Sequence, residues 1–190
     1  MLLFREKIPA DWLPKVRAQL NAVLVDHAHL ERKAATTAIT LEKYKQLFPS
    51  VHELNAIAIE ELQHFELVLK LLEKRGVPFS QPLRSPWISG MMHGVRNGVE
   101  QQVIDHLIVC ALIEGRSCEK FQVLAEALRT DEPELADFYA SLVESEGNHY
   151  ATYLIMARHI DEPETDRRLD WFLNRDAELM RVHHSLPILH

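Results

Sequence analysis

Apolar residues recur three and four positions apart through long stretches of this chain, a spacing that places them on one face of an α-helix. Prolines and glycines divide this pattern into segments. Ser50 with Glu53 three residues later matches a capping box, which marks the start of a helix. The pattern predicts four long helices and a shorter fifth one, over 14–48, Ser50 to Gly76, 99–130, 131–160, and from Pro163 to before Pro187.

The segment 77–98 stands apart, because it holds three prolines and three glycines. We interpret it as a long crossover or lid that contains a short helix. Short turns elsewhere and one long connection predict an all-α, ferritin-like four-helix bundle with a crossover between helices two and three and an extra C-terminal helix. A length of 190 residues suits a single domain over 1–190. An elongated coiled coil is the alternative, and the broad apolar faces disfavour it.

Each of the four long helices carries a glutamate in the middle of its apolar stripe, and two of them add a histidine one turn later. A single Glu-x-x-His is a weak signal, since chance gives about one match in a chain of this composition. Here two occur, and both fall mid-helix on apolar faces. The candidate metal ligands are Glu31, Glu61, His64, Glu114, Glu146 and His149.

These residue types have a physical reason to occur together. Burying an unpaired carboxylate costs several kcal/mol, so packing alone does not explain four of them. Two divalent cations would balance four glutamates, and imidazoles bind such cations through a neutral nitrogen. Glu31 precedes Glu61 by 30 residues and Glu114 precedes Glu146 by 32. One Glu from each of two helices plus a Glu-x-x-His from each of the other two is the di-iron carboxylate pattern.

Other polar residues near these positions have simpler expected roles. His27, one turn before Glu31, is either a partner of that ligand or a partly buried histidine, and the spacing leaves both open. A solvated or salt-bridged role is expected for Glu60, with an alternative ligand as the other reading, and solvent exposure for His183 and His184. Core packing is expected for Cys118, Tyr139 and Tyr153.

Composition narrows the functional classes. The formal net charge of −7 gives no global indication of a nucleic-acid partner, so RNA binding would need a local basic patch. Long apolar runs are missing, which disfavours a membrane span, and the apolar start is too short for a signal-peptide core. The two cysteines, Cys110 and Cys118, lie eight residues apart on one predicted helix, too far for a disulfide. Reduced thiols agree with a cytoplasmic location.

Four stretches resemble the tRNA 2-methylthio-N6-isopentenyladenosine hydroxylase (MiaE-like) family. They are DHAHLERKAA at 26–35, EELQHF at 60–65, IEGRSCEKF at 113–121 and SEGNHY at 145–150. The resemblance covers about residues 20–160. Family members usually have Ala at the position of Gly115, Arg at that of Lys120, and often Ala-Arg at Gly147-Asn148. None of these departures changes a candidate ligand. Gly115 and Gly147 are poor helix formers, so we expect them to loosen their helices locally.

The resemblance implies an oxygen-dependent di-iron monooxygenase. It would hydroxylate the isopentenyl group of a modified adenosine next to the tRNA anticodon. By this reading the six candidate ligands hold two iron ions, dioxygen is the co-substrate, and an external reductase or ferredoxin supplies electrons. The partners would be the tRNA anticodon loop and this electron donor, with no membrane. Trp87, Met91, Met92 and His93 of the crossover are candidates for covering the pocket.

Three alternatives stay open on the residues alone. The first is a di-iron hydroxylase of a small apolar substrate such as a quinone, and the second is a non-catalytic, ferritin-type iron-binding protein. The third is a di-manganese catalase-like protein, because manganese and iron accept the same ligands. A rubrerythrin is disfavoured, since no Cys-x-x-Cys pair is present. Cations that could contact phosphates lie at Lys70, Lys74, Arg75, Arg84 and Arg96.

Overall fold

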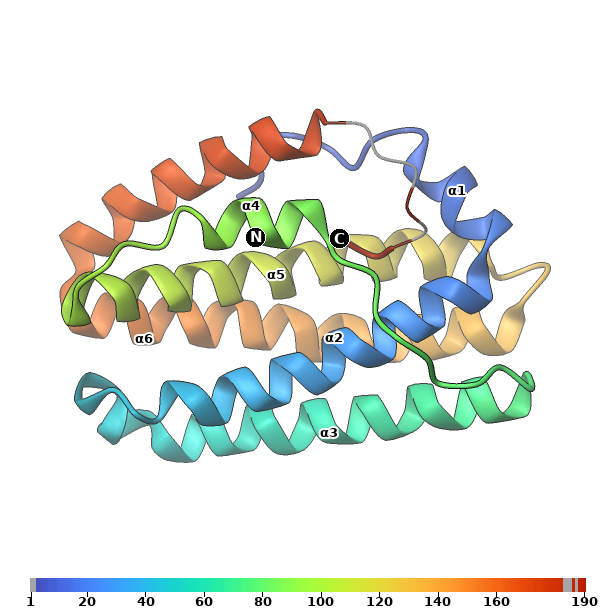
Figure 1. The fold of residues 1–190 in the computed structure, drawn as a ribbon, viewed down its shortest axis with the longest axis horizontal. Coiled ribbons are helices and arrows are strands. Elements are labelled where there is room, and N and C mark those ends of the chain that lie inside the picture. The colour runs from blue at the N-terminus through green and yellow to red at the C-terminus, as the bar shows by residue number, and fades with distance from the viewer. Residues whose placement is uncertain (1–2, 183–185, 187) are drawn as a thin grey trace. The chain divides into compact units, whose positions relative to one another are not determined.

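The computed structural model describes residues 3–182, 186 and 188–190, and these residues form helices and no strands (Figure 1). No helix among them is long and apolar enough to cross a membrane. The elements in chain order are α1 (Trp12–Ala18), α2 (Leu20–Leu41), the 3-10 helix η1 (Lys45–Ser50), α3 (Val51–Lys74), α4 (Pro86–Met92), α5 (Val99–Ala127) and α6 (Pro133–Met180). The predicted all-α class is therefore confirmed, and His183 and His184 lie outside the described residues.

The helices belong to two compact units. The first takes its described residues from 3–13, 86–182 and 190, and the second from 14–85, 186 and 188–189. In the first unit α5 packs along α6, and α4 packs against α6 as well. In the second unit α2 packs along α3, as Figure 1 also shows. Each long pair thus buries the apolar stripes that the sequence places on its helices.

The predicted helix over 14–48 is wrong as a single element. Helix α1 ends at Ala18, Gln19 has non-helical backbone angles, and α2 stops at Leu41. Beyond it, Leu41, Tyr44 and Leu47 are all buried. Their spacing of three residues matches the three residues per turn of a 3-10 helix, the form that η1 adopts.

Helix α3 begins and ends where the sequence predicts. Ser50 is its N-cap residue, but the predicted capping-box hydrogen bond is wrong, because the Ser50 side chain makes no cap bond. At the other end Gly76 has a positive φ of 65°. The amide of Val77 donates to the Leu72 carbonyl at 2.9 Å, and that of Gly76 to the Glu73 carbonyl at 2.9 Å. This is a Schellman motif, which glycine favours.

In the first unit α6 combines the predicted fourth and fifth helices. Asp161 has φ −160° and ψ 102°, which are extended angles that bend the helix at this residue. Its carboxylate oxygen accepts a hydrogen bond from the Glu164 amide at 2.9 Å, so Asp161 caps the segment that follows. Pro163 lies inside the first turn of that segment, where a missing amide hydrogen costs little.

Two buried acidic residues tie the last part of α6 to α5. Asp105 of α5 accepts hydrogen bonds from Nε of Arg96 and Nε of Arg168, both at 2.8 Å. Asp176 of α6 accepts hydrogen bonds from Nε of Arg116 and from the Trp87 indole, both at 3.0 Å. Burial raises the pKa of Asp105, but the hydrogen bonds from its two arginines outweigh this effect and lower the pKa.

Gly115 interrupts neither α5 nor its packing, so the predicted local loosening of this helix is wrong. A Cβ atom at this position would lie 2.9 Å from the Tyr150 ring and 3.0 Å from the Phe4 ring. The Arg116 guanidinium lies 3.8 Å from the centroid of the same Phe4 ring. The glycine therefore makes room for aromatic side chains that cover α5.

Asp105→Asn is expected to destabilise the protein by about 3 kcal/mol, because it leaves two arginines without their buried counterion. Urea denaturation at pH 7 measures the change. The folded-state pKa of Asp105 is lowered, so its stabilisation is present above the ordinary carboxyl pKa and is lost as the pH falls below it. Asp137→Asn is the control, since Asp137 forms an exposed pair with Arg129 at 3.3 Å. Equal losses in both variants would contradict the role of Asp105.

Candidate metal centre

Three of the predicted ligands meet in the second unit. Glu31 lies on α2, and Glu61 and His64 lie one turn apart on α3, along the buried stripe that also holds Leu54 and Val68. All three are buried, and each offers a ligand atom within 4.8 Å of the others. Nδ1 of His64 lies 3.5 Å from a Glu31 oxygen and 3.8 Å from a Glu61 oxygen. We call these residues the α2–α3 triad.

His27 is a direct partner of this triad. It lies one turn before Glu31 on α2, is fully buried, and its Nε2 bonds a Glu31 carboxylate oxygen. The second oxygen of Glu31 faces His64. Of the two roles left open for His27, the structure supports the partner of Glu31. This contact holds the Glu31 carboxylate in one orientation.

The charges of the α2–α3 triad depend on one another. Burial by itself raises the pKa of Glu31, but the charge and hydrogen bond of His27, together with its interactions with His64 and Glu61, lower it well below the ordinary value. Burial lowers the pKa of His64, but hydrogen bonds to Glu31 and Glu61 and their negative charges raise it to about 10. Without a cation, a proton on His64 therefore supplies positive charge to the two carboxylates.

The other three predicted ligands meet in the first unit. Glu114 lies on α5, and Glu146 and His149 lie one turn apart on α6. All are buried, and their ligand atoms also lie within 4.8 Å of one another. We call these residues the α5–α6 triad. Each triad thus contains two carboxylates and one imidazole.

This donor set fits a divalent first-row metal. Two carboxylates at such short range repel each other when both are ionised, unless a cation lies between them. Imidazole and carboxylate together suit iron, manganese or zinc, whereas thiolate-preferring metals would need sulfur. Cys118 lies one turn after Glu114, but it packs with its Sγ 3.5 Å from the Val143 carbonyl. The chemistry of each triad is therefore that of an oxygen- and nitrogen-ligated metal site.

The remaining predictions near the site have mixed outcomes. Tyr139 and Tyr153 are buried, as expected of core residues, and Glu60 is half-buried rather than fully solvated. Trp87 and Met91 of the crossover are buried, and the Trp87 indole donates a hydrogen bond to Asp176, so their role in covering the pocket stays a prediction. Met92 and His93 are exposed.

Several of the cations proposed for phosphate contact already bond to other side chains of the protein. Arg96 donates to Asp105 and to Glu164, at 2.6 Å to the latter, which removes it as a phosphate ligand. Arg75 bonds the Asn21 side chain at 2.8 Å. Lys70 pairs with Glu66 at 3.7 Å on an exposed part of α3, where such pairs are weak.

Comparison with known proteins bears on the whole chain. Residues 2–190 match the family described as tRNA-(MS[2]IO[6]A)-hydroxylase (MiaE). A protein of Pseudomonas putida, named tRNA 2-(methylsulfanyl)-N(6)-isopentenyladenosine(37) hydroxylase, is 35% identical over 188 residues, which are 94% of this chain and 90% of that protein. A protein of the same name from Salmonella typhimurium is 36% identical over 135 residues, 67% of this chain and 49% of that protein.

A solved structure matches the fold. It is named "Protein 43 with aldehyde deformylating oxygenase activity from Synechococcus" and is 30% identical in sequence. The match covers 100% of this chain and 96% of that chain, with a TM-score of 0.91. The predicted ferritin-like fold is thereby confirmed.

In the metal-free protein, the His64 imidazole is expected to titrate near pH 10, and Glu31→Gln is expected to lower this pKa because it removes one of the two carboxylates. NMR titration of the ring protons measures both values. Because this pKa is raised in the folded state, protonated His64 contributes fully to the free energy of unfolding at pH values below its ordinary pKa of about 6.5. The contribution is lost as the pH rises through the pKa of the folded protein. Glu53→Gln, near the exposed start of α3, is the control. Titration of His64 near 6.5 in the wild type would disprove the coupling.

Proposed function

The chain belongs to the MiaE family of tRNA hydroxylases, and we propose that it hydroxylates the isopentenyl group of 2-(methylsulfanyl)-N6-isopentenyladenosine in tRNA, next to the anticodon. The observation that carries this proposal is the family match along residues 2–190. The two buried triads support it, because insertion of oxygen into a C–H bond requires chemistry that protein side chains lack. We assign the enzyme to the cytoplasm, together with its tRNA substrate.

We propose further that the two triads together hold two iron ions, with Glu31, Glu61, His64, Glu114, Glu146 and His149 as ligands. Four ionised glutamates carry four negative charges, which balance the four positive charges of two ferrous ions. When bound, the iron ions supply the binding and reductive activation of dioxygen. The metal also takes over the role of the proton on His64, since a ligating imidazole must be neutral.

The chain's own residues set the conditions for this chemistry. His27 holds one oxygen of Glu31 and so fixes the direction of the other oxygen. Buried apolar neighbours such as Ile57 and Val68 on α3, and Leu142 and Tyr153 on α6, keep water away from the ligands. The substrate adenosine lies in a single-stranded loop, so moving it out of its stack costs less than flipping a base from a duplex.

The oxygen balance requires a partner. One atom of dioxygen enters the C–H bond and the other leaves as water, which consumes two protons and two electrons beyond those of the substrate. We propose that an external reductase or a ferredoxin delivers these electrons. An acidic chain with a net charge of −7 would favour a donor with a complementary basic surface.

A second candidate is oxidation of a small apolar substrate. It is favoured by the likeness to the Synechococcus protein, which is named for aldehyde deformylating oxygenase activity. Such an activity would use the same ligands but would need no RNA contacts. The two candidates therefore differ in substrate and share the metal centre.

Glu114→Ala and His149→Ala are expected to lose bound iron and activity while keeping helical content, because each removes a ligand from a buried site. Metal analysis and circular dichroism measure the two quantities. Matched controls are Glu126→Ala on α5 and Glu144→Ala on α6, both at exposed positions. Full iron content in both ligand variants would refute the ligand assignment.

The iron-loaded protein, given dioxygen, a reductant and tRNA carrying the modified adenosine, is expected to yield a nucleoside heavier by one oxygen atom. Nucleoside mass analysis after digestion measures this product. A long-chain aldehyde is tested in parallel for loss of its formyl carbon. Unchanged tRNA together with a shortened aldehyde product would replace the proposed function with the second candidate.

A further inference from the structure

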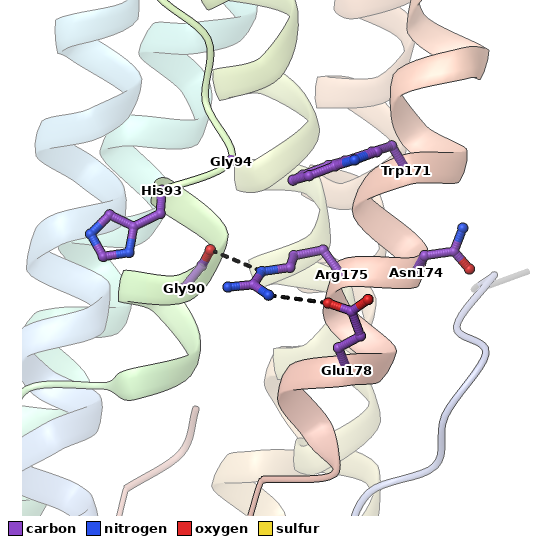
Figure 2. Close-up of a pocket in the computed structure, with 7 residues that line it drawn as sticks. All are labelled: Gly90, His93, Gly94, Trp171, Asn174, Arg175 and Glu178. Carbon is purple, nitrogen blue, oxygen red and sulfur yellow. Dashed lines mark hydrogen bonds and ion pairs between the residues drawn. The ribbon is translucent and has the colours of Figure 1, made fainter.

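A pocket of about 280 Å³ lies in the first unit between α4 and the last part of α6 (Figure 2). None of the metal ligands lines it. The lining side chains include Trp171, Asn174, Arg175 and Glu178 of α6, with His93 just beyond α4. Pockets for drug-sized ligands span about 300–1,000 Å³, so this volume suits one planar ring system and not a longer molecule.

Trp171 gives this pocket an aromatic wall. The chain has three tryptophans, and Trp12 and Trp87 are buried, whereas Trp171 is 42% exposed. The Arg168 guanidinium lies 4.6 Å from the Trp171 ring centroid, and Phe172 meets it edge-to-face with centroids 4.9 Å apart. These contacts fix the indole while leaving a large part of it accessible. Figure 2 shows the ring edge-on at one end of the pocket.

Two glycines of the pocket lining allow α4 and the residue after His93 to pack closely against α6. A Cβ atom at Gly94 would lie 2.5 Å from the six-membered ring of Trp171, and one at Gly90 would lie 2.5 Å from the Leu179 side chain. The indole edge thus lies directly against the backbone after α4. A larger residue at Gly94 would overlap with the Trp171 ring and would push it out of its contacts with Arg168 and Phe172.

Hydrogen-bond donors face the same space. Arg175 donates from Nε to the Gly90 carbonyl at 3.5 Å and from Nη1 to Glu178 at 3.1 Å. Its Nη2 has no hydrogen-bond partner among the described residues, and the same holds for the His93 imidazole. In Figure 2 the Arg175 guanidinium reaches from α6 toward Gly90, and the His93 ring extends from the chain just after α4.

We propose that this pocket binds a nucleobase stacked on the Trp171 indole, with the attached phosphate held by Arg175 and His93. A stacked base with a phosphate can come from RNA or from a free nucleotide, and the choice of RNA rests on the proposed function. In that case the pocket anchors a second nucleotide of the tRNA, apart from the one that is hydroxylated. An aromatic wall next to an arginine is the usual arrangement for binding single-stranded nucleic acid.

The first experiment follows Trp171 directly in the full iron-containing protein. Acrylamide quenches the fluorescence of accessible tryptophans, and Trp171 is the accessible one of the three. Adenosine 5′-monophosphate and an unmodified 17-nucleotide RNA hairpin with a seven-nucleotide loop are the probes. Both are expected to protect the fluorescence from quenching, and Trp171→Phe provides the baseline for the two buried tryptophans.

The second experiment measures hairpin affinity by fluorescence anisotropy of labelled RNA. Trp171→Ala is expected to raise Kd about tenfold, and Trp171→Phe is expected to retain most of the affinity, since phenylalanine still stacks. Arg175→Gln is expected to reduce the slope of log K against log salt by about 0.7, the value for one phosphate of a single strand. Arg167→Gln is the matched control, because Arg167 also pairs with a glutamate three residues away on α6.

The outcomes separate the two sources and the two proposals. Hairpin binding that depends on Trp171 and exceeds the affinity of the mononucleotide supports the RNA source, and equal affinity supports a free nucleotide. Dependence on Trp171 without any hydroxylated product would leave the pocket standing and reject the proposed function. Unchanged Kd in Trp171→Ala, with circular dichroism confirming the fold of both tryptophan variants, or no protection by either probe, overturns the nucleobase site.

Discussion

Buried negative charge is the constraint on which the rest of this structure depends. The structure shows two ways of balancing this charge. Asp105 and Asp176 are each neutralised by arginines of the chain. The carboxylates of the two triads are instead grouped with one another and with imidazoles. Two carboxylates at such range need a cation between them, and an imidazolium supplies at most one positive charge. This composition suits a bound metal ion, whereas the aspartate–arginine pairs already balance their charges.

The shared buried faces of the candidate ligands could be predicted from the sequence, because helical periodicity is rigid. A residue three positions after a buried glutamate must share its face, so Glu61 specifies His64 and Glu146 specifies His149. The role of His27 could not be predicted in the same way. The spacing of four residues places the His27 and Glu31 side chains next to each other, but the His27 ring could equally turn towards the core. Only the contact between Nε2 and the Glu31 carboxylate decides the matter.

The predicted helix boundaries differ from the structure mainly where residues contact partners that lie far away in the sequence. The region 14–48 satisfies helical periodicity throughout, yet Tyr44 and Leu47 are buried through a 3-10 helix instead. Trp87 lies in a segment rich in proline and glycine, and its indole donates a hydrogen bond to a buried acceptor, Asp176, far along the chain. The sequence around Trp87 gives no indication of this hydrogen-bond acceptor, which lies 89 residues away. For the same reason the exposed Trp171 did not stand out among the residues of an amphipathic helix.

The bend at Asp161 connects stability with the position of the ligands. Before it, α6 carries Glu146 and His149, and after it the chain supplies Arg168 and Asp176. These two residues bond Asp105 and Arg116 of α5, one on either side of Glu114. Helix α5 is therefore fixed nine residues before Glu114 and two residues after it by the same helix that carries the other two residues of this triad. Side chains that hold a metal must keep their geometry within fractions of an ångström, and such fixation at two points limits both rotation and sliding of α5.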